Sequence, residues 1–219
     1  MAVPQAGLAA GALTMHIVLI HGMGRTPASM LILKRRLAQL GHQTHLFGYA
    51  AWAEHLDGVS ARLARRIAQV AGMRPYAVIG HSLGSVILRR ALGKLSANPP
   101  CHCFFLAPPM RACKAARFFS RYRLYRALTG EMGGLLADES FMQSLPLPPN
   151  TVIYAGTGGP RANWLPFGNQ ANDGILALDE VASDGGERVE VAASHTFIMN
   201  SRAVFDDIVR RLATTQAAA

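Results

Sequence analysis

Apolar residues along this chain form two alternating kinds of segment: short continuous runs and longer stretches with helical periodicity. A short apolar run that ends at a turn residue is typical of a strand buried in a parallel sheet. Such runs predict strands at residues 15–20, 45–47, 76–79, 101–106, 152–155 and 188–191. Helices are predicted at residues 27–40, 54–71, 83–95 and 201–212.

Strands that alternate with helices predict an α/β fold, with about six mostly parallel strands flanked by helices. The segment 107–150 is longer than a crossover requires, so we expect it to contain a small cap between the fourth and fifth strands. We predict one domain at residues 14–219, preceded by a flexible N-terminal segment at residues 1–13.

The composition narrows the class of protein. Half of the residues are hydrophobic, which suits one domain with a full core. No apolar run approaches the roughly 20 residues that a membrane span needs. The early stretch LAAGAL is short and lacks a basic flank, so we expect no signal peptide and a cytoplasmic location.

The three cysteines form no regular disulfide framework. Cys101 and Cys103 flank His102, a pattern that could bind a metal, but no second pair of ligands is evident. In the apolar run CHCFFL, alternation would place both thiols on one face of a strand. We therefore interpret them as core thiols and expect no metal.

The strand predicted at 76–79 is followed by GHSLG at residues 80–84, which has the pattern G-x-S-x-G. Between a strand and a helix, this pattern forms a sharp turn that holds the serine in a strained conformation at the carboxyl end of the sheet. The glycines leave room for the neighbouring strand and helix. We predict that Ser82 is a nucleophile.

An activated serine needs a base and an acid that orients the base, here expected in the chain order Ser, Asp, His. His195 is the only histidine after residue 150, and it follows the sixth predicted strand. Asp173, in an Asn-Asp-Gly turn, is the first carboxylate after the fifth strand and is our preferred acid. The rivals are Asp179 and Glu180, in a segment that looks helical and solvated, and Asp184, in a loop.

A tetrahedral intermediate carries an oxyanion, which backbone N–H groups must stabilise. One N–H should come from Leu83, directly after the nucleophile. The other should come from the glycine-rich loop after the first strand, with Met23 as the expected donor.

The segments IVLIHGMG, VIGHSLGS, LAPP, NDGIL and SHTFIM resemble the α/β-hydrolase superfamily. They are most similar to its compact bacterial lipase/esterase-like branch, related to GPI inositol-deacylase-like hydrolases, over residues 14–212. The resemblance implies hydrolysis of carboxylic esters through an acyl-enzyme, without a metal or organic cofactor. It also implies a triad of Ser82, Asp173 and His195.

The same resemblance implies that Met23 and Leu83 are the oxyanion donors. The first predicted strand matches the third strand of the family, which leaves a minimal six-stranded sheet. Relatives often have Gly-Ser after the LxPP run, whereas residues 110–112 here are Met-Arg-Ala. The wall of the pocket is therefore expected to differ there.

The net charge of +9 is unevenly distributed. The segment 114–128, KAARFFSRYRLYRAL, has aromatic residues at helical spacing and a stripe formed by Lys114, Arg117 and Arg121, which predicts one basic amphipathic helix. A solvated cap helix is the favoured interpretation, and peripheral contact with an anionic membrane or an acidic partner is the alternative. Nucleic acid is not expected, because no nucleic-acid-binding motif accompanies the charge.

The predicted triad leaves several functions open. An esterase, lipase or phospholipase-like enzyme acting on a small-molecule or lipid ester is the leading hypothesis. A thioesterase, amidase or acyltransferase would use the same triad. A hydrolase-like binding module without activity is the non-enzyme alternative, which the complete set of Ser, Asp and His argues against.

Overall fold

All six apolar runs form strands, and the strands pair in parallel in one sheet of order β2-β1-β3-β4-β5-β6. The strands are β1 (His16–Ile20), β2 (Gln43–Phe47), β3 (Tyr76–His81), β4 (His102–Leu106), β5 (Thr151–Gly156) and β6 (Glu187–Val191). β1, β3 and β5 are buried throughout, whereas the edge strands β2 and β6 keep exposed residues. This burial explains why the inner strands are continuous apolar runs.

The computed structural model describes residues 14–95, 98–164 and 167–217. The flexible segment expected at residues 1–13 lies outside these ranges, and the predicted division into that segment and one domain stays a prediction. The helices are α1 (Leu31–Gln39), α2 (Leu56–Ala71), α3 (Leu83–Leu92), α4 (Lys114–Phe119), α5 (Arg123–Leu135), α6 (Glu139–Ser144), α7 (Leu178–Val181) and α8 (Arg202–Ala217), with 3-10 turns η1 (Pro27–Met30) and η2 (Ile198–Asn200). No helix within those ranges is long and apolar enough to cross a membrane.

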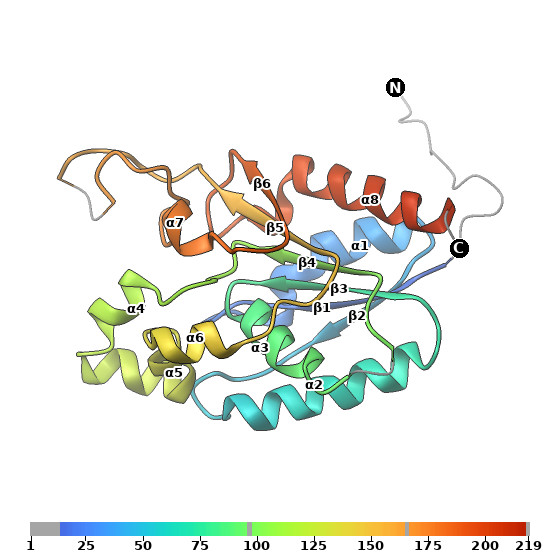
Figure 1. Cartoon of the computed structure of the whole chain (residues 1–219), viewed down its shortest axis with the longest axis horizontal. Coiled ribbons are helices and arrows are strands. Elements are labelled where there is room, and N and C mark those ends of the chain that lie inside the picture. The colour runs from blue at the N-terminus through green and yellow to red at the C-terminus, as the bar shows by residue number, and fades with distance from the viewer. Residues whose placement is uncertain (1–13, 96–97, 165–166, 218–219) are drawn as a thin grey trace.

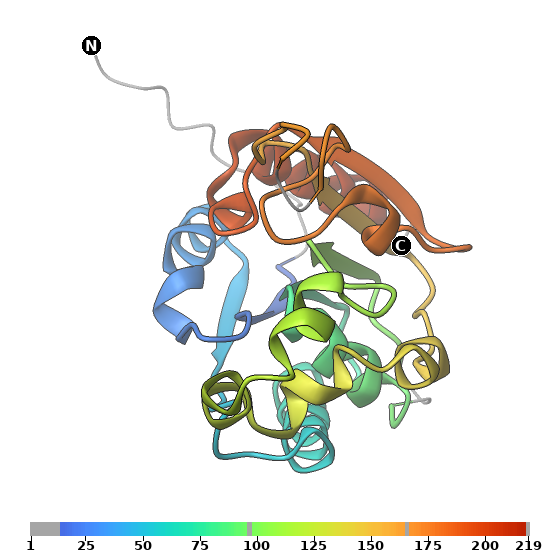
Figure 2. The same cartoon turned by 90° about the vertical axis from the view of Figure 1, so that its left-hand side faces the viewer.

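The helices cover both faces of the sheet, as Figures 1 and 2 show. Apolar residues of α1 and α8 pack on one face, and those of α2 and α3 pack on the other. The cap helices α4, α5 and α6 lie between β4 and β5 in the chain. The predicted α/β class, with about six parallel strands and a cap between strands four and five, is confirmed.

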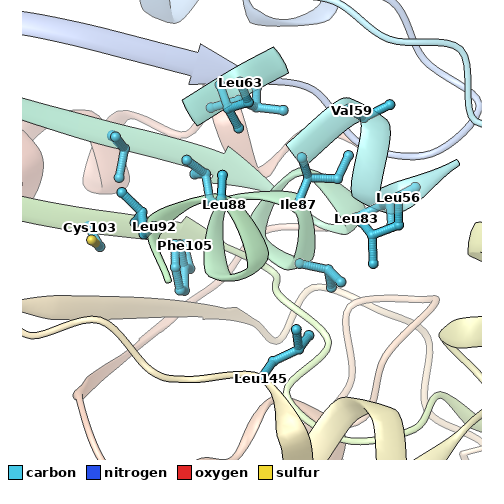
Figure 3. Close-up of a cluster of buried hydrophobic side chains, with 14 of the residues drawn as sticks. Leu56, Val59, Leu63, Leu83, Ile87, Leu88, Leu92, Cys103, Phe105 and Leu145 are labelled. Atoms are coloured by element: carbon cyan, nitrogen blue, oxygen red, sulfur yellow. The ribbon is translucent and has the colours of Figure 1, made fainter. Parts of the chain in front are cut away.

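The helix α3 is fixed by the apolar core beneath it (Figure 3). Leu83 and Ile87 of α3 lie beside Leu56 and Val59 of α2, and all four are buried. Phe105 of β4 belongs to the same cluster. The core therefore holds the helix that begins directly after Ser82.

The single basic helix predicted over 114–128 is wrong, because the chain breaks after α4 and starts again at α5. The side chains of Ser120 and Arg121 donate hydrogen bonds to the carbonyls of Arg117 and Phe118, at 3.1 and 2.7 Å. Such local bonds compete with continuation of a helix. Tyr122 is then extended, with φ −91° and ψ 132°, and precedes α5.

The expected basic stripe does not consist of free charges. The Nζ of Lys114 lies 2.9 Å from the carboxylate of Asp179, and a guanidinium nitrogen of Arg117 lies 3.0 Å from that of Glu139. The guanidinium of Arg121 lies over the ring of Phe118, 4.2 Å from its centroid. The carboxylates come from segments distant in the sequence, so the sequence pattern could not reveal them.

The two neighbouring thiols lie in different environments, contrary to the expected single face. Cys103 is buried in the cluster with α2 and α3, whereas Cys101 is only partly buried and packs against the cluster on the other face. The reason is that β4 begins at His102, so strand alternation does not extend back to Cys101.

Candidate active site

Ser82 occupies a sharp turn between β3 and α3. Its backbone has φ 50° and ψ −121°, a conformation that costs on the order of 1–3 kcal/mol for a residue with a side chain. The backbone N–H of Ser82 donates to the carbonyl of Leu106 on β4, at 2.9 Å, which ties the turn to the sheet. This geometry presents the serine at the carboxyl end of the sheet.

Close packing explains the glycines on either side of Ser82. A Cβ at Gly80 would lie 2.8 Å from the backbone nitrogen of Ser85, and a Cβ at Gly84 would lie 2.6 Å from the carbonyl oxygen of His21. These backbone atoms cannot move away without disturbing α3 or the end of β1. The turn therefore requires glycine at both positions.

His195 and Asp173 meet at the ends of β6 and β5. The Nδ1 of His195 lies 2.7 Å from Oδ2 of Asp173, and both side chains are buried. A carboxylate can only accept, so Nδ1 donates and Nε2 of His195 is left as the acceptor. The backbone N–H of His195 also donates to the carbonyl of Asp173, at 2.9 Å, which fixes the two loops together.

The Asn-Asp-Gly turn positions the carboxylate of Asp173. Its Oδ1 accepts hydrogen bonds from the backbone N–H groups of Ile175 and Leu176, at 2.9 and 2.7 Å. The Oδ1 of Asn172 accepts from the N–H of Gly174, at 2.9 Å, and φ of Gly174 is 98°. These bonds hold one carboxylate oxygen on the backbone and leave the other for His195.

The two backbone N–H groups predicted to stabilise an oxyanion belong to Met23 and Leu83. Met23 follows β1, and Leu83 is the first residue of α3, whose first N–H groups have no partner inside the helix. Among the described residues, neither N–H donates a hydrogen bond. Both donors are therefore available to a ligand.

His81, which precedes Ser82, connects the serine turn to the loop of His195. Its Nε2 lies 3.0 Å from the carbonyl oxygen of His195. Burial lowers the pKa of His81 well below its ordinary value, and the nearby His195 adds to this effect. His81 is therefore neutral, with Nε2–H as the donor to that carbonyl.

Ser82, His195 and Met23 line one pocket with a volume of about 830 Å³. The remaining wall is largely apolar, and much of it comes from the cap. The cap contributes Cys113, Ala116, Phe118, Phe119, Tyr125 and Leu136. The described ranges contain no group of three or more side chains able to hold a metal ion.

No family model matches this sequence, and no curated protein matches it by sequence. Its structure is similar to the mature lipase BlEst2 from Bacillus licheniformis, with TM-score 0.65 and 15% identity over 96% of both chains. It is similar to the metagenomic carboxyl esterase MGS0156, with TM-score 0.66 and 18% identity over 98% of this chain and 79% of that one. It is also similar to RedJ, a thioesterase of the prodiginine pathway in Streptomyces coelicolor, with TM-score 0.58 and 15% identity over 98% and 90%.

The chain has the α/β-hydrolase fold. In this fold the nucleophile lies in a turn between a strand and a helix, and the acid and the base follow later strands. Here Ser82 lies between β3 and α3, Asp173 follows β5 and His195 follows β6. The narrower resemblance to GPI inositol-deacylase-like hydrolases is not tested by these structures and stays a prediction.

In the described part of the chain, none of the three rival carboxylates forms a hydrogen bond or ion pair with His195. Asp179 is paired with Lys114, and Asp184 is exposed in the loop before β6. Glu180 was expected to be solvated, and this is wrong, because it is buried and burial raises its pKa.

Glu180 connects the cap to the loop that carries Asp173, here called the acid loop. Its side-chain oxygens accept hydrogen bonds from the N–H groups of Lys114, at 2.6 Å, and Ala177, at 2.9 Å. Its backbone carbonyl accepts from the N–H groups of Met110 and Arg111, at 2.9 and 3.2 Å. No local sequence signal marks Glu180, since its partners start the cap almost 70 residues earlier.

Proposed function

We propose that this chain is a serine hydrolase that cleaves carboxylic esters through an acyl-enzyme. One observation carries the proposal: the strained Ser82 opens into the same pocket as His195, whose Nδ1 lies 2.7 Å from Asp173. A nucleophile, a base and an orienting carboxylate in this chain order suit acyl transfer.

In the first half of the reaction, Oγ of Ser82 attacks the ester carbonyl carbon while its proton moves to Nε2 of His195. The carbonyl π electrons move to oxygen, and the N–H groups of Met23 and Leu83 stabilise that oxyanion. When the intermediate collapses, the bond to the leaving oxygen breaks and His195 gives its proton to that oxygen. Asp173 stabilises the imidazolium that exists between these steps.

In the second half, water attacks the acyl carbon and gives a proton to His195. The bond to Oγ of Ser82 then breaks, and His195 returns the proton to the serine. The products are a carboxylic acid and the free enzyme, so no further reactant is needed.

The apolar pocket supports an acyl substrate of moderate length. Its wall offers hydrophobic contacts, and each buried methylene stabilises binding by roughly 0.8 kcal/mol. A thioesterase is the second candidate, because the chain is structurally similar to the thioesterase RedJ as well as to lipases and esterases. The triad alone does not separate the two reactions.

We expect a fluorophosphonate probe to label the native protein and to leave Ser82→Ala unlabelled, because only an activated serine reacts. Intact-mass measurement with peptide mapping checks this result. A matched series of esters and thioesters with increasing acyl length would then define the preferred bond and chain. Absence of labelling and of turnover across the series would contradict the proposed function.

Peripheral contact with an anionic membrane through Lys114, Arg117 and Arg121 is a further proposal. Each cation near such a surface contributes on the order of 1 kcal/mol, but two of these three are already paired with carboxylates. We therefore expect replacement of all three with glutamine to weaken binding to anionic vesicles by roughly ten- to a hundredfold at low salt. Vesicle co-sedimentation measures this.

The control variant removes three exposed cations that lie outside the segment 114–128, so its net charge changes by the same amount. The control replaces Arg65, Arg66 and Lys94 with glutamine. Equal loss of binding in both triple variants would show that only net charge matters. If the native protein does not co-sediment with anionic vesicles at low salt, the proposal is contradicted.

A further inference from the structure

The pocket carries positive charge without any acidic side chain in its wall. Its charged lining residues are Arg25 and Lys114. The charge of Lys114 is offset by Asp179, at 2.9 Å. Arg25, by contrast, forms no ion pair with any residue in the described part of the chain. A half-buried guanidinium without a counter-ion in a ligand pocket is available for an anion.

Arg25 is held in place by one hydrogen bond. It follows the loop that carries Met23, and its Nη1 donates to the carbonyl of Thr196, at 2.8 Å. A guanidinium has five N–H donors in a fixed planar arrangement, so one tether fixes its position and leaves most of its donors free. Thr196 also lines the pocket.

The tether joins Arg25 to the loop that carries His195. In the proposed reaction His195 protonates the leaving oxygen or sulfur, so the leaving group must lie against His195. Thr196 is the residue directly after His195, and Arg25 binds its carbonyl. The apolar cap residues Phe118, Phe119 and Leu136 remain for the acyl chain.

The positive charge of Arg25 affects the pKa of two nearby histidines. Burial is the main cause that lowers the pKa of His21 and of His81, and the positive charge of Arg25 lowers both further. The same field favours an anion bound near these residues.

We infer that Arg25 is a specificity-determining residue that binds an anionic group on the leaving group of the substrate. The substrate class is then an apolar acyl ester or thioester whose alcohol or thiol carries a phosphate or carboxylate. This inference rests on the proposed function and narrows it. A guanidinium matches both anions because its paired N–H groups fit two oxygens.

The experiment compares two matched pairs of substrates. One pair is octanoyl glycerol phosphate against octanoyl glycerol, and the other is octanoyl phosphopantetheine against octanoyl pantetheine. Within each pair the acyl chain and scissile bond are the same, and only the anion differs. We expect the native protein to have the higher kcat/KM for the phosphorylated member of at least one pair, chiefly through a lower KM, and raised salt should reduce this preference.

We expect Arg25→Gln to reduce the preference for the phosphorylated member by roughly tenfold, and Arg25→Lys to restore part of it. Arg36→Gln is the matched control. The Nη1 of Arg36 also donates to a backbone carbonyl, that of Asn200, at 3.2 Å, but Arg36 is not among the residues that line the pocket. The control should keep the native preference. The pair with the larger preference separates a glycerophospholipid source from a pantetheine carrier.

Three outcomes would overturn the inference, and they are distinguishable. If Arg25→Gln lowers kcat/KM equally for both members of a pair, Arg25 only holds the loop of Thr196. If the native protein does not distinguish the members of either pair, the anion site is absent while acyl hydrolysis stands. If none of the four substrates is hydrolysed and the fluorophosphonate probe does not react, the proposed function itself fails.

Discussion

Replacement of Ser82 with alanine is expected to lower kcat for a short soluble ester by at least about a thousandfold. The alanine side chain cannot form the bond to the acyl carbon, so only uncatalysed attack by water within the oxyanion site remains. Steady-state kinetics of the purified variant measure the loss. Thermal unfolding should stay near native, because the methyl group fits where the serine Cβ already lies.

Ser144→Ala is the matched control for the same chemical change. The Oγ of Ser144 donates to the carbonyl of Phe141, at 2.7 Å, at the end of α6, and Ser144 does not line the pocket. Near-native turnover of Ser82→Ala would point to another nucleophile. Cys113 also lines the pocket, but burial raises the pKa of its thiol to about 12, which leaves little thiolate to react.

Asp173→Asn is expected to lower kcat by roughly a thousandfold or more. The amide retains an oxygen for the N–H groups of Ile175 and Leu176, so the loop should keep its shape. Its NH₂ group would then meet Nδ1 of His195, which favours the tautomer with the proton on Nε2. That tautomer cannot accept the serine proton, and the amide does not stabilise an imidazolium.

Asp179→Asn and Asp184→Asn provide controls for the loss of one negative charge near the same loop. Asp179 is paired with Lys114 at the surface and Asp184 is exposed, so each variant should stay within about threefold of native kcat. A larger loss in Asp184→Asn than in Asp173→Asn would move the orienting carboxylate to the loop before β6.

The strands could be predicted from sequence because burial on both faces of a parallel sheet requires continuous apolar runs. Residues 15–20 and 76–79 show this directly, and both become strands buried throughout. The cap could not be predicted in the same detail. At the end of α4 the side chains of Ser120 and Arg121 bond to the carbonyls of Arg117 and Phe118, and periodicity does not encode these bonds.

Some residues of the candidate site could likewise be predicted from the sequence, and others could not. Ser82, Asp173 and His195 were predicted because each follows a predicted strand in the order that the mechanism requires, and parallel strands bring these ends to one edge of the sheet. Arg25 and Glu180 were not predicted as functional. Their roles depend on which distant carbonyls and N–H groups they meet in the fold, and the sequence gives no local sign of those partners.

The contacts of Glu180 set the boundaries for building chimaeras from this scaffold. The cap leaves the sheet after β4 and returns at β5, adjacent strands, so a different cap could be grafted between them without rethreading the sheet. In such a graft, however, Glu180 would belong to the recipient protein. Its carboxylate accepts from the N–H of Lys114 at the start of α4, and its backbone carbonyl accepts from the N–H groups of Met110 and Arg111. A donor cap therefore needs the native junction through Lys114, because a graft that displaced this N–H would leave the buried carboxylate with only the N–H of Ala177 as a donor.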